Sequence, residues 1–200
     1  MYTTQWASNF SGFTNSAPMD LHKFVLFFEE HIANRIFHYT TDNAAIPSFI
    51  IDSRAEQLPH LMGLQYWNNI HVKQGSKQYE LLISGKWDMS FLSKADNGAF
   101  KEFKERIESM PYLYNMLYKC DCEIKQIHPV MDSPFKRRRI NMIFQKQSSK
   151  LAHILELREK NTSGKDRIYV PTSFSVYPKK AKALVGKHTK LNTKLIRISQ

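Results

Sequence analysis

The spacing of apolar residues changes along the chain, and this change constrains the fold more than any other feature. In the first two thirds apolar residues recur at helical intervals, and Asp20 precedes the clearest such series: Leu21, Phe24, Val25, Phe28, Ile32 and Ile36. After residue 139 apolar residues alternate with polar ones, as at Ile140, Met142 and Phe144. Helical periodicity followed by strand periodicity predicts an α+β fold, with N-terminal helices packed on a small antiparallel β-sheet formed mainly by the C-terminal half.

Several shorter segments carry their own signals. One or two short helices are expected over residues 77–93, a clearer helix begins after Asn97-Gly98, and helical turns continue from Tyr112 to Tyr118. Strands are expected over residues 46–51, 151–157, 167–176 and 191–198. The turn-forming residues 161–166 predict that the strands on either side of them form an antiparallel hairpin.

The domain organisation follows from composition. Residues 1–18 are rich in Ser, Thr and Asn and predict an irregular lead-in, whereas residues 19–200 predict a single domain. A content of 42% hydrophobic residues is sufficient for one buried core. The two cysteines, Cys120 and Cys122, provide no disulfide framework and are interpreted as reduced thiols.

Positive charge is concentrated in the C-terminal third. From Pro134 onwards the chain has 17 Lys and Arg against 3 Asp and Glu, whereas residues 1–133 have 12 against 15. This asymmetry predicts a surface that faces a polyanion, since basic side chains on a phosphate backbone release condensed counterions. A solvated basic face that only aids solubility is the alternative. The run Lys136, Arg137, Arg138 and Arg139 is the candidate nucleic-acid contact, and it could instead dock on an acidic antitoxin or immunity protein or act as a localisation signal.

Several function classes lack their characteristic motifs. The sequence has no glycine-rich nucleotide loop, no GxSxG elbow and no cluster of metal-binding carboxylates, so we expect neither a cofactor nor a metal ion. The longest apolar run, residues 24–28, is too short to cross a bilayer, and the N-terminus does not resemble a signal peptide. We therefore expect a cytoplasmic protein.

The remaining possibility is RNA cleavage without a metal ion. RNA supplies its own nucleophile, the 2′-hydroxyl, so the protein needs only a proton-transfer group and groups that stabilise charge on phosphate. His60 is the proton-transfer candidate, because Pro59 and Gly63 frame it and its imidazole titrates near neutrality. The alternative is an ordinary hydrogen-bonded histidine at a turn. Four further residues would complete the site if the fold brings them together, namely Arg54, Lys150, Thr172 and Ser173.

Short motifs in the same order along the chain resemble a known family. Residues 49–51 followed by 58–64, then 149–151 and 171–174, resemble blocks of the PBECR4 group of phage-associated Barnase–EndoU–colicin E5/D–RelE-like nucleases. The resemblance implies helices followed by an antiparallel sheet, and an RNase of phage, mobile-element or toxin origin. It matches His60 to the family histidine, Lys150 to a strand lysine and Ser173 to a late hydroxyl, whereas Met62 stands where the family commonly has a small hydroxyl residue.

Two functions follow from these observations. The first is a metal-independent endoribonuclease toxin whose partner is RNA, such as tRNA or mRNA. The second is a non-catalytic phage or mobile-element protein that binds nucleic acid or an acidic protein through its basic surface.

Overall fold

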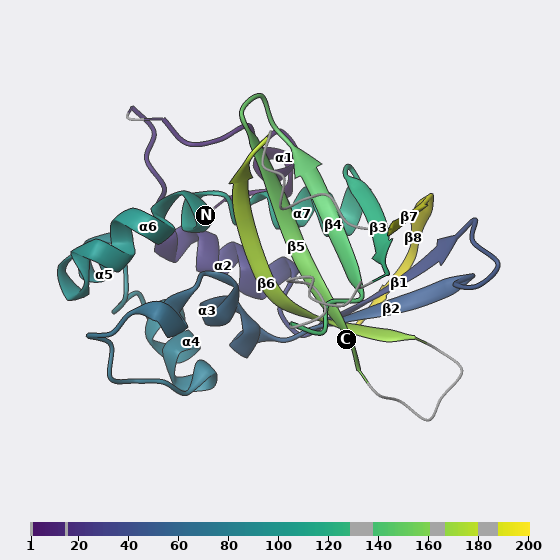
Figure 1. Cartoon of the computed structure of the whole chain (residues 1–200). Coiled ribbons are helices and arrows are strands. Elements are labelled where there is room, and N and C mark those ends of the chain that lie inside the picture. The colour runs from purple at the N-terminus through teal and green to yellow at the C-terminus, as the bar shows by residue number, and fades with distance from the viewer. Residues whose placement is uncertain (1, 15, 129–137, 161–166, 180–187) are drawn as a thin grey trace.

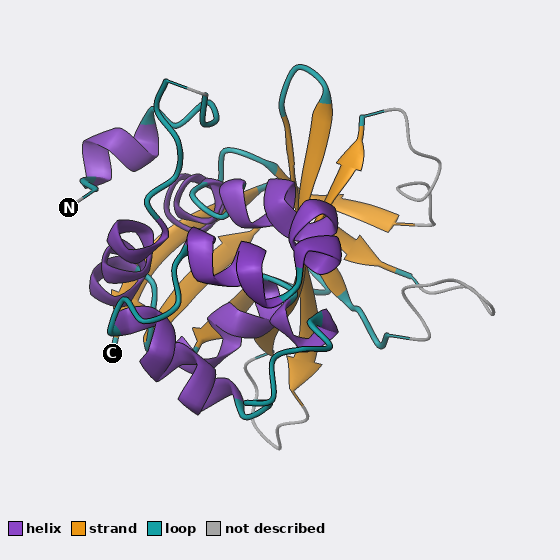
Figure 2. Ribbon diagram, turned by 90° about the vertical axis from the view of Figure 1, so that its left-hand side faces the viewer, coloured by secondary structure: helices purple, strands orange, loops and turns teal. Residues whose placement is uncertain are grey.

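The computed structural model describes residues 2–14, 16–128, 138–160, 167–179 and 188–200. Within these residues the fold has two layers, a strongly curved β-sheet and a layer of helices that covers one face of it (Figure 1, Figure 2). Aromatic side chains fill the space between the layers, and Phe24, Phe28, Tyr39 and Phe144 are all fully buried there. The α+β class predicted from the spacing of apolar residues is confirmed.

The sheet contains eight strands among the described residues, in the order β7-β3-β4-β5-β6-β2-β1-β8. Their bounds are β1 Arg35–Thr41, β2 Ser48–Ser53, β3 Glu123–Ile127, β4 Met142–Gln147, β5 Leu151–Lys160, β6 Ile168–Pro178, β7 His188–Leu191 and β8 Thr193–Ser199. Neighbouring strands are antiparallel except β2 and β6, which are parallel. Only Asn192 separates the two edge strands β7 and β8 in the chain, so the sheet curls until its opposite edges approach each other.

The helices are mostly short. Their bounds are α1 Thr4–Ser8, α2 Leu21–His31, α3 Leu58–Leu61, α4 Gly75–Ile83, α5 Met89–Ala95, α6 Asn97–Glu108 and α7 Tyr112–Lys119, with 3-10 turns η1 Ala55–Gln57 and η2 Leu64–Tyr66. Carboxylates cap the two longest, because Asp20 accepts a hydrogen bond from the backbone N–H of Lys23 and Asp96 from that of Ala99. None of the described helices is long and apolar enough to span a lipid bilayer.

The expected size and position of the sheet were wrong. The sheet is large, and β1 and β2 come from the first third of the chain. The apolar series after Asp20 does not continue as a helix to Ile36, because the helix ends at His31, Asn34 adopts a left-handed backbone with φ of 54°, and Ile36 lies in β1. β-branched and aromatic residues dominate this strand, and they favour an extended backbone once the chain has turned.

Other details of the predicted elements also changed. The segment expected as one closing strand over residues 191–198 belongs to two strands at opposite edges of the sheet. The lead-in contains helix α1 and contributes Ala7 and Phe10 to the core. In contrast, the predicted hairpin is confirmed, since β5 and β6 pair in antiparallel register from Leu151 and Pro178 to Lys160 and Ile168.

His153 on β5 is a neutral histidine held inside the protein. It is 2% exposed, its ring centre lies 4.3 Å from that of Tyr112, and neither ring nitrogen has a hydrogen-bond partner among the described residues. Burial, with a smaller effect of Lys146, lowers the pKa of His153 to about 4. The unfolded chain therefore takes up this proton first as the pH falls, since its histidine has a pKa of about 6.5.

We expect His153 to make the protein less stable in acid. Its contribution to the free energy of unfolding should fall by up to about 3 kcal/mol between the unfolded pKa of about 6.5 and the folded pKa of about 4, and then level off. Urea unfolding at pH 7 and pH 4.5 measures the loss. His153→Leu should be less sensitive to pH than the wild type. Equal pH dependence in wild type and His153→Leu would contradict this assignment.

Candidate active site

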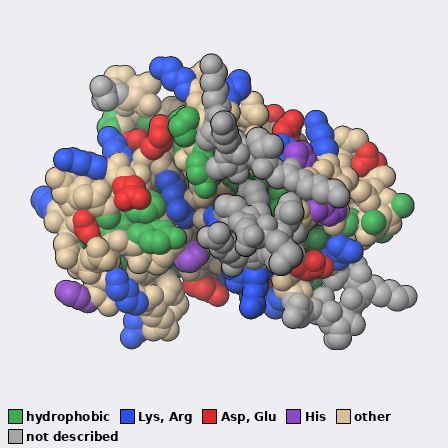
Figure 3. Space-filling model, viewed as in Figure 1, with side chains coloured by type: hydrophobic (Ala, Val, Ile, Leu, Met, Phe, Trp, Pro, Cys, Tyr) green, Lys and Arg blue, Asp and Glu red, His purple; other side chains and the backbone are tan. Residues whose placement is uncertain are grey.

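One edge of β6 is free of strand pairing over most of its length, and helices cover it instead. β5 pairs with β6 throughout, but β2 pairs only with Ile168 and Tyr169 at its beginning. Helices α3 and α6 contact the remainder of β6. Figure 3 shows a hydrophobic patch over the region between α3 and α6, with acidic and basic side chains beside it. Strand β5 and helices α3 and α6, which are far apart in the sequence, therefore meet beside residues 171–178.

A β-bulge bends β6 at this place. Glu156 of β5 pairs with Ser173, and the next residue, Leu157, pairs with Pro171, so that Thr172 is an extra residue on β6. The Thr172 hydroxyl donates a hydrogen bond to the carbonyl oxygen of Glu156 at 3.1 Å. Bulges change the direction of side chains and are common next to active sites. The local irregularity thus gives Thr172 and Ser173 positions that a regular strand would not.

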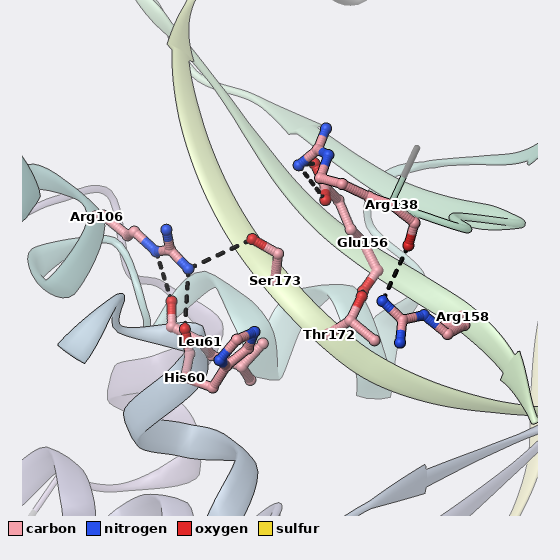
Figure 4. Close-up of polar contacts among 8 residues, drawn as sticks. All are labelled: His60, Leu61, Arg106, Arg138, Glu156, Arg158, Thr172 and Ser173. Atoms are coloured by element: carbon pink, nitrogen blue, oxygen red, sulfur yellow. Dashed lines mark hydrogen bonds and ion pairs between the residues drawn. The ribbon is translucent and has the colours of Figure 1, made fainter. Parts of the chain in front are cut away.

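Arg106, at the end of α6, connects the helices to the sheet. Its Nε donates to the carbonyl oxygen of Leu61 at 2.6 Å, and its Nη2 donates to the carbonyl oxygen of His60 at 3.0 Å and to Ser173 Oγ at 3.4 Å (Figure 4). The two carbonyls belong to the last turn of α3, and that of His60 also accepts a hydrogen bond from the backbone N–H of Gly63 at 3.0 Å. Burial lowers the pKa of Arg106 to about 10, so its guanidinium remains charged at neutral pH.

His60 lies in α3, whose short length is set by its flanking residues. Pro59 occupies the first turn, and Gly63 ends the helix in a left-handed conformation with φ of 86°. A Cβ at residue 63 would also lie 2.8 Å from the Phe103 ring, so a larger residue would force the Phe103 side chain or α6 to move. The exposed His60 side chain is thereby directed toward Thr172 of β6 (Figure 4).

The surroundings of His60 favour its neutral form. Desolvation lowers the pKa of His60, and the positive charges of Arg106 and Arg158 lower it further, while a hydrogen bond with the Thr172 backbone acts in the opposite direction. A histidine with a pKa below its usual value of about 6.5 is mostly neutral at pH 7. His60 can therefore accept a proton at neutral pH, and the nearby arginines can stabilise negative charge.

A buried carboxylate holds a second arginine at the same end of the sheet. Glu156 is 1% exposed, and Arg138 Nη1 lies 2.8 Å from its Oε1 and 2.6 Å from its Oε2. Burial raises the pKa of Glu156, whereas Arg138 and Arg106 lower it. Arg158 donates to the carbonyl oxygen of Arg138 at 3.0 Å. Three guanidinium groups and one buried carboxylate therefore lie near Thr172 and Ser173.

A surface cleft of about 580 Å³ opens beside this cluster. Arg106, Arg138, Ser173, Tyr66 and Phe103 are among the residues that line it. This space allows a phosphate and its attached nucleoside to reach the arginines. No group of three or more His, Cys, Asp or Glu side chains in the described parts of the chain is arranged to hold a metal ion.

The fold brings three of the five predicted catalytic residues together. His60, Thr172 and Ser173 lie in the cluster (Figure 4). Lys150 lies at the far end of the hairpin, because the adjacent Leu151 pairs with Pro178 whereas Glu156 pairs with Ser173. Five residues of extended strand correspond to roughly 17 Å. Arg54 forms an ion pair with Asp52, with Nε 2.6 Å from Oδ1, and its side chain is half exposed.

The predicted basic run is only partly described. Arg138 belongs to the cluster, and the exposed Arg139 adopts a left-handed backbone and lines a neighbouring depression with Arg158. Lys136 and Arg137 lie outside the described residues.

The prediction from sequence missed Arg106, Glu156 and Arg158. The first two carried a signal that could have been used, since each is a charged residue at a position where the pattern requires burial. Arg106 follows Phe103 by three residues on the apolar face of α6, and Glu156 lies between Leu155 and Leu157 in a fully buried stretch of β5. A charge at such a position needs a partner. Arg158 had no comparable signal.

The chain matches the model of a known protein family. Residues 20–198 match the family model described as phage-Barnase-EndoU-ColicinE5/D-RelE like nuclease4, PBECR4. No curated protein and no solved structure matches the chain. The match includes α3, α6 and β6, the elements that form the cluster around His60.

Proposed function

Because the chain belongs to the PBECR4 family of nucleases, we propose that it is a toxin that cleaves RNA without a metal ion. The observation that carries this proposal is the position of His60, whose pKa is lowered, beside two hydroxyl side chains and three arginines. These groups supply the two requirements of RNA transesterification, proton transfer and stabilisation of charge on phosphate.

The proposed reaction proceeds through the 2′-hydroxyl of the substrate. Neutral His60 accepts the proton of this hydroxyl while the 2′-oxygen attacks phosphorus. The bond from phosphorus to the 5′-oxygen breaks, and the His60 imidazolium returns the proton to that oxygen. The products are a 2′,3′-cyclic phosphate and a free 5′-hydroxyl. Arg106 and Ser173 bind the phosphate oxygens as negative charge develops, and Thr172 fixes the bulge that positions Ser173.

Replacing the 2′-hydroxyl tests this chemistry. The substrates are two single-stranded oligonucleotides of the same sequence, one all ribose and one all 2′-deoxyribose, incubated with the protein in EDTA. We expect the RNA to yield fragments that end in 2′,3′-cyclic phosphate and the deoxy strand to remain intact. Cleavage of the deoxy strand at a similar rate would contradict the proposed nucleophile.

The buried Met62 favours a second candidate function. Met62 is fully buried and supplies no hydroxyl where the family commonly has one, which is compatible with a scaffold that binds without cleaving. In that case the protein is a phage or mobile-element factor that binds nucleic acid or an acidic protein. Expression in bacteria separates the two candidates. A toxin should arrest growth, and His60→Ala or co-expression of an acidic antitoxin should relieve the arrest, whereas a binder should be tolerated in both forms.

A further inference from the structure

The Phe103 ring stacks on that of Tyr66 and lies near the Arg106 guanidinium, and all three residues line the cleft. The rings of Tyr66 and Phe103 are parallel within 4°, with centres 5.2 Å apart, and the Arg106 guanidinium lies 5.7 Å from the centre of the Phe103 ring. Tyr66 is 56% exposed, although large hydrophobic side chains are usually covered. Phe103 stacks against one face of the Tyr66 ring, and more than half of Tyr66 remains open to solvent.

The core does not require Tyr66 to cover Phe103. The Phe103 ring centre is already 5.4 Å from that of the fully buried Trp67. A flat aromatic face left open by the fold is suited to bind another flat group.

The open ring face and the phosphate-binding groups share one cleft. Tyr66 lines it together with Arg106, Arg138 and Ser173. Side chains with hydrogen-bonding capacity also reach the cleft, among them Asn68, Asp96 and Glu102. A ligand that places a flat ring on Tyr66 and an anion at Arg106 matches this arrangement, and a nucleotide has both parts.

We propose that Tyr66 is a stacking platform for the nucleobase next to the phosphate held by Arg106 and Ser173, so that the substrate is single-stranded nucleic acid. This inference rests on the proposed function for the identity of the phosphate site. A base can lie flat on an aromatic ring only when it is not stacked in a duplex. Base stacking on aromatic side chains tolerates different bases and typically contributes on the order of tenfold in affinity per base.

Binding without cleavage tests the platform. The probe is a single-stranded 2′-deoxy oligonucleotide that contains 2-aminopurine, whose fluorescence falls when it stacks, and the matching duplex is the comparison. We expect the wild type to quench the probe and bind the single strand more tightly than the duplex. Tyr66→Ala should bind the single strand about tenfold more weakly and lose the quenching, whereas Tyr66→Phe should retain both.

A matched control distinguishes stacking from loss of exposed apolar surface. Ile196 on β8 is 59% exposed, and Ile196→Ala should bind the probe as the wild type does. Unchanged quenching and affinity in Tyr66→Ala, or no binding of the probe by the wild type, would overturn the proposal. The binding test needs no turnover, so the two proposals can fail separately. Binding that depends on Tyr66, in a protein that does not cleave RNA, would refute the proposed nuclease but support the platform. RNA cleavage by a protein whose binding does not change in Tyr66→Ala would support the nuclease and refute the platform.

Discussion

Replacement of His60 by Ala is expected to lower the rate of RNA cleavage by about two to four orders of magnitude, the usual contribution of a positioned proton-transfer group. The side chain is exposed, and the contacts that fix α3 are made by backbone carbonyls, so the variant should fold as the wild type does. Initial rates on a fluorescent single-stranded RNA, with circular dichroism as a check of folding, measure the effect. His71→Ala removes another exposed histidine and should retain the wild-type rate.

The pH dependence identifies the role of His60 more directly. Only neutral His60 accepts a proton, so the rate should rise with pH through the pKa of His60. Desolvation, Arg106 and Arg158 hold that pKa below about 6.5, and the midpoint of the acidic limb should lie there too. Arg158→Ala removes one of these charges and should move the midpoint upward. A wild-type rate in His60→Ala, or an acidic limb that persists in it, would exclude His60 as the base.

Replacement of Arg106 by Ala is expected to impair both catalysis and stability. Loss of a charge-stabilising donor typically lowers turnover by about 100- to 1000-fold. The variant also removes the donor to the buried carbonyl of Leu61, and an unpaired buried polar group costs about 1–3 kcal/mol. The carbonyl of His60 keeps its hydrogen bond from the backbone N–H of Gly63. Arg106→Lys keeps the charge but cannot reproduce the forked geometry, so it should also be defective. Urea unfolding and cleavage rates measure the two effects.

The exposed Arg158 provides the matched control for Arg106. It contributes positive charge near His60 and donates one hydrogen bond to the backbone of Arg138. Arg158→Ala should therefore reduce RNA cleavage with little change in unfolding free energy. If Arg106→Ala is as active as the wild type under conditions where it is folded, the guanidinium serves only to join α3 to β6.

Replacing Lys150 tests whether this residue has the role that the family motif implies, although the structure places it far from the cluster around His60. The motif matches Lys150 to a strand lysine, but the register of β5 and β6 places its neighbour Leu151 roughly 17 Å along the hairpin from Ser173. We therefore expect Lys150→Ala to cleave RNA within about threefold of the wild-type rate. A loss as large as that of His60→Ala would instead show that the substrate extends along the hairpin to the pocket that Lys150 lines with His153.

The sequence predicted those elements that are determined by residues close together in the chain. The cap at Asp20, the frame of His60 and the hairpin of β5 and β6 depend on neighbouring residues, and their signals were reliable. The helix expected after Asn97-Gly98 begins at Asn97, with Asp96 as its cap. The boundary between α2 and β1 was missed because Ile36 continues the helical spacing by coincidence, while the left-handed turn at Asn34 decides the structure.

Long-range pairing explains what the sequence could not predict. Ser173 meets Arg106 across 67 residues, and the carbonyl of His60 meets it across 46. The register between β5 and β6 determines whether Lys150 or Arg106 lies near Ser173, where we propose that the substrate phosphate binds. The position of Arg106 also depends on β2, which does not pair with the second half of β6. No local pattern encodes either of these features. The contributions of Arg106 and Arg158 to the site therefore became apparent only from the fold, whereas Arg138 belongs to the basic run predicted from the sequence.

The most direct test of metal-independent RNA cleavage is incubation of the purified wild-type protein with total RNA and with tRNA in EDTA. The proposed function predicts discrete fragments that carry 2′,3′-cyclic phosphate ends and form without added metal. RNA that stays intact while the protein retains it in a salt-sensitive manner would contradict the nuclease and leave a nucleic-acid-binding protein on a nuclease scaffold.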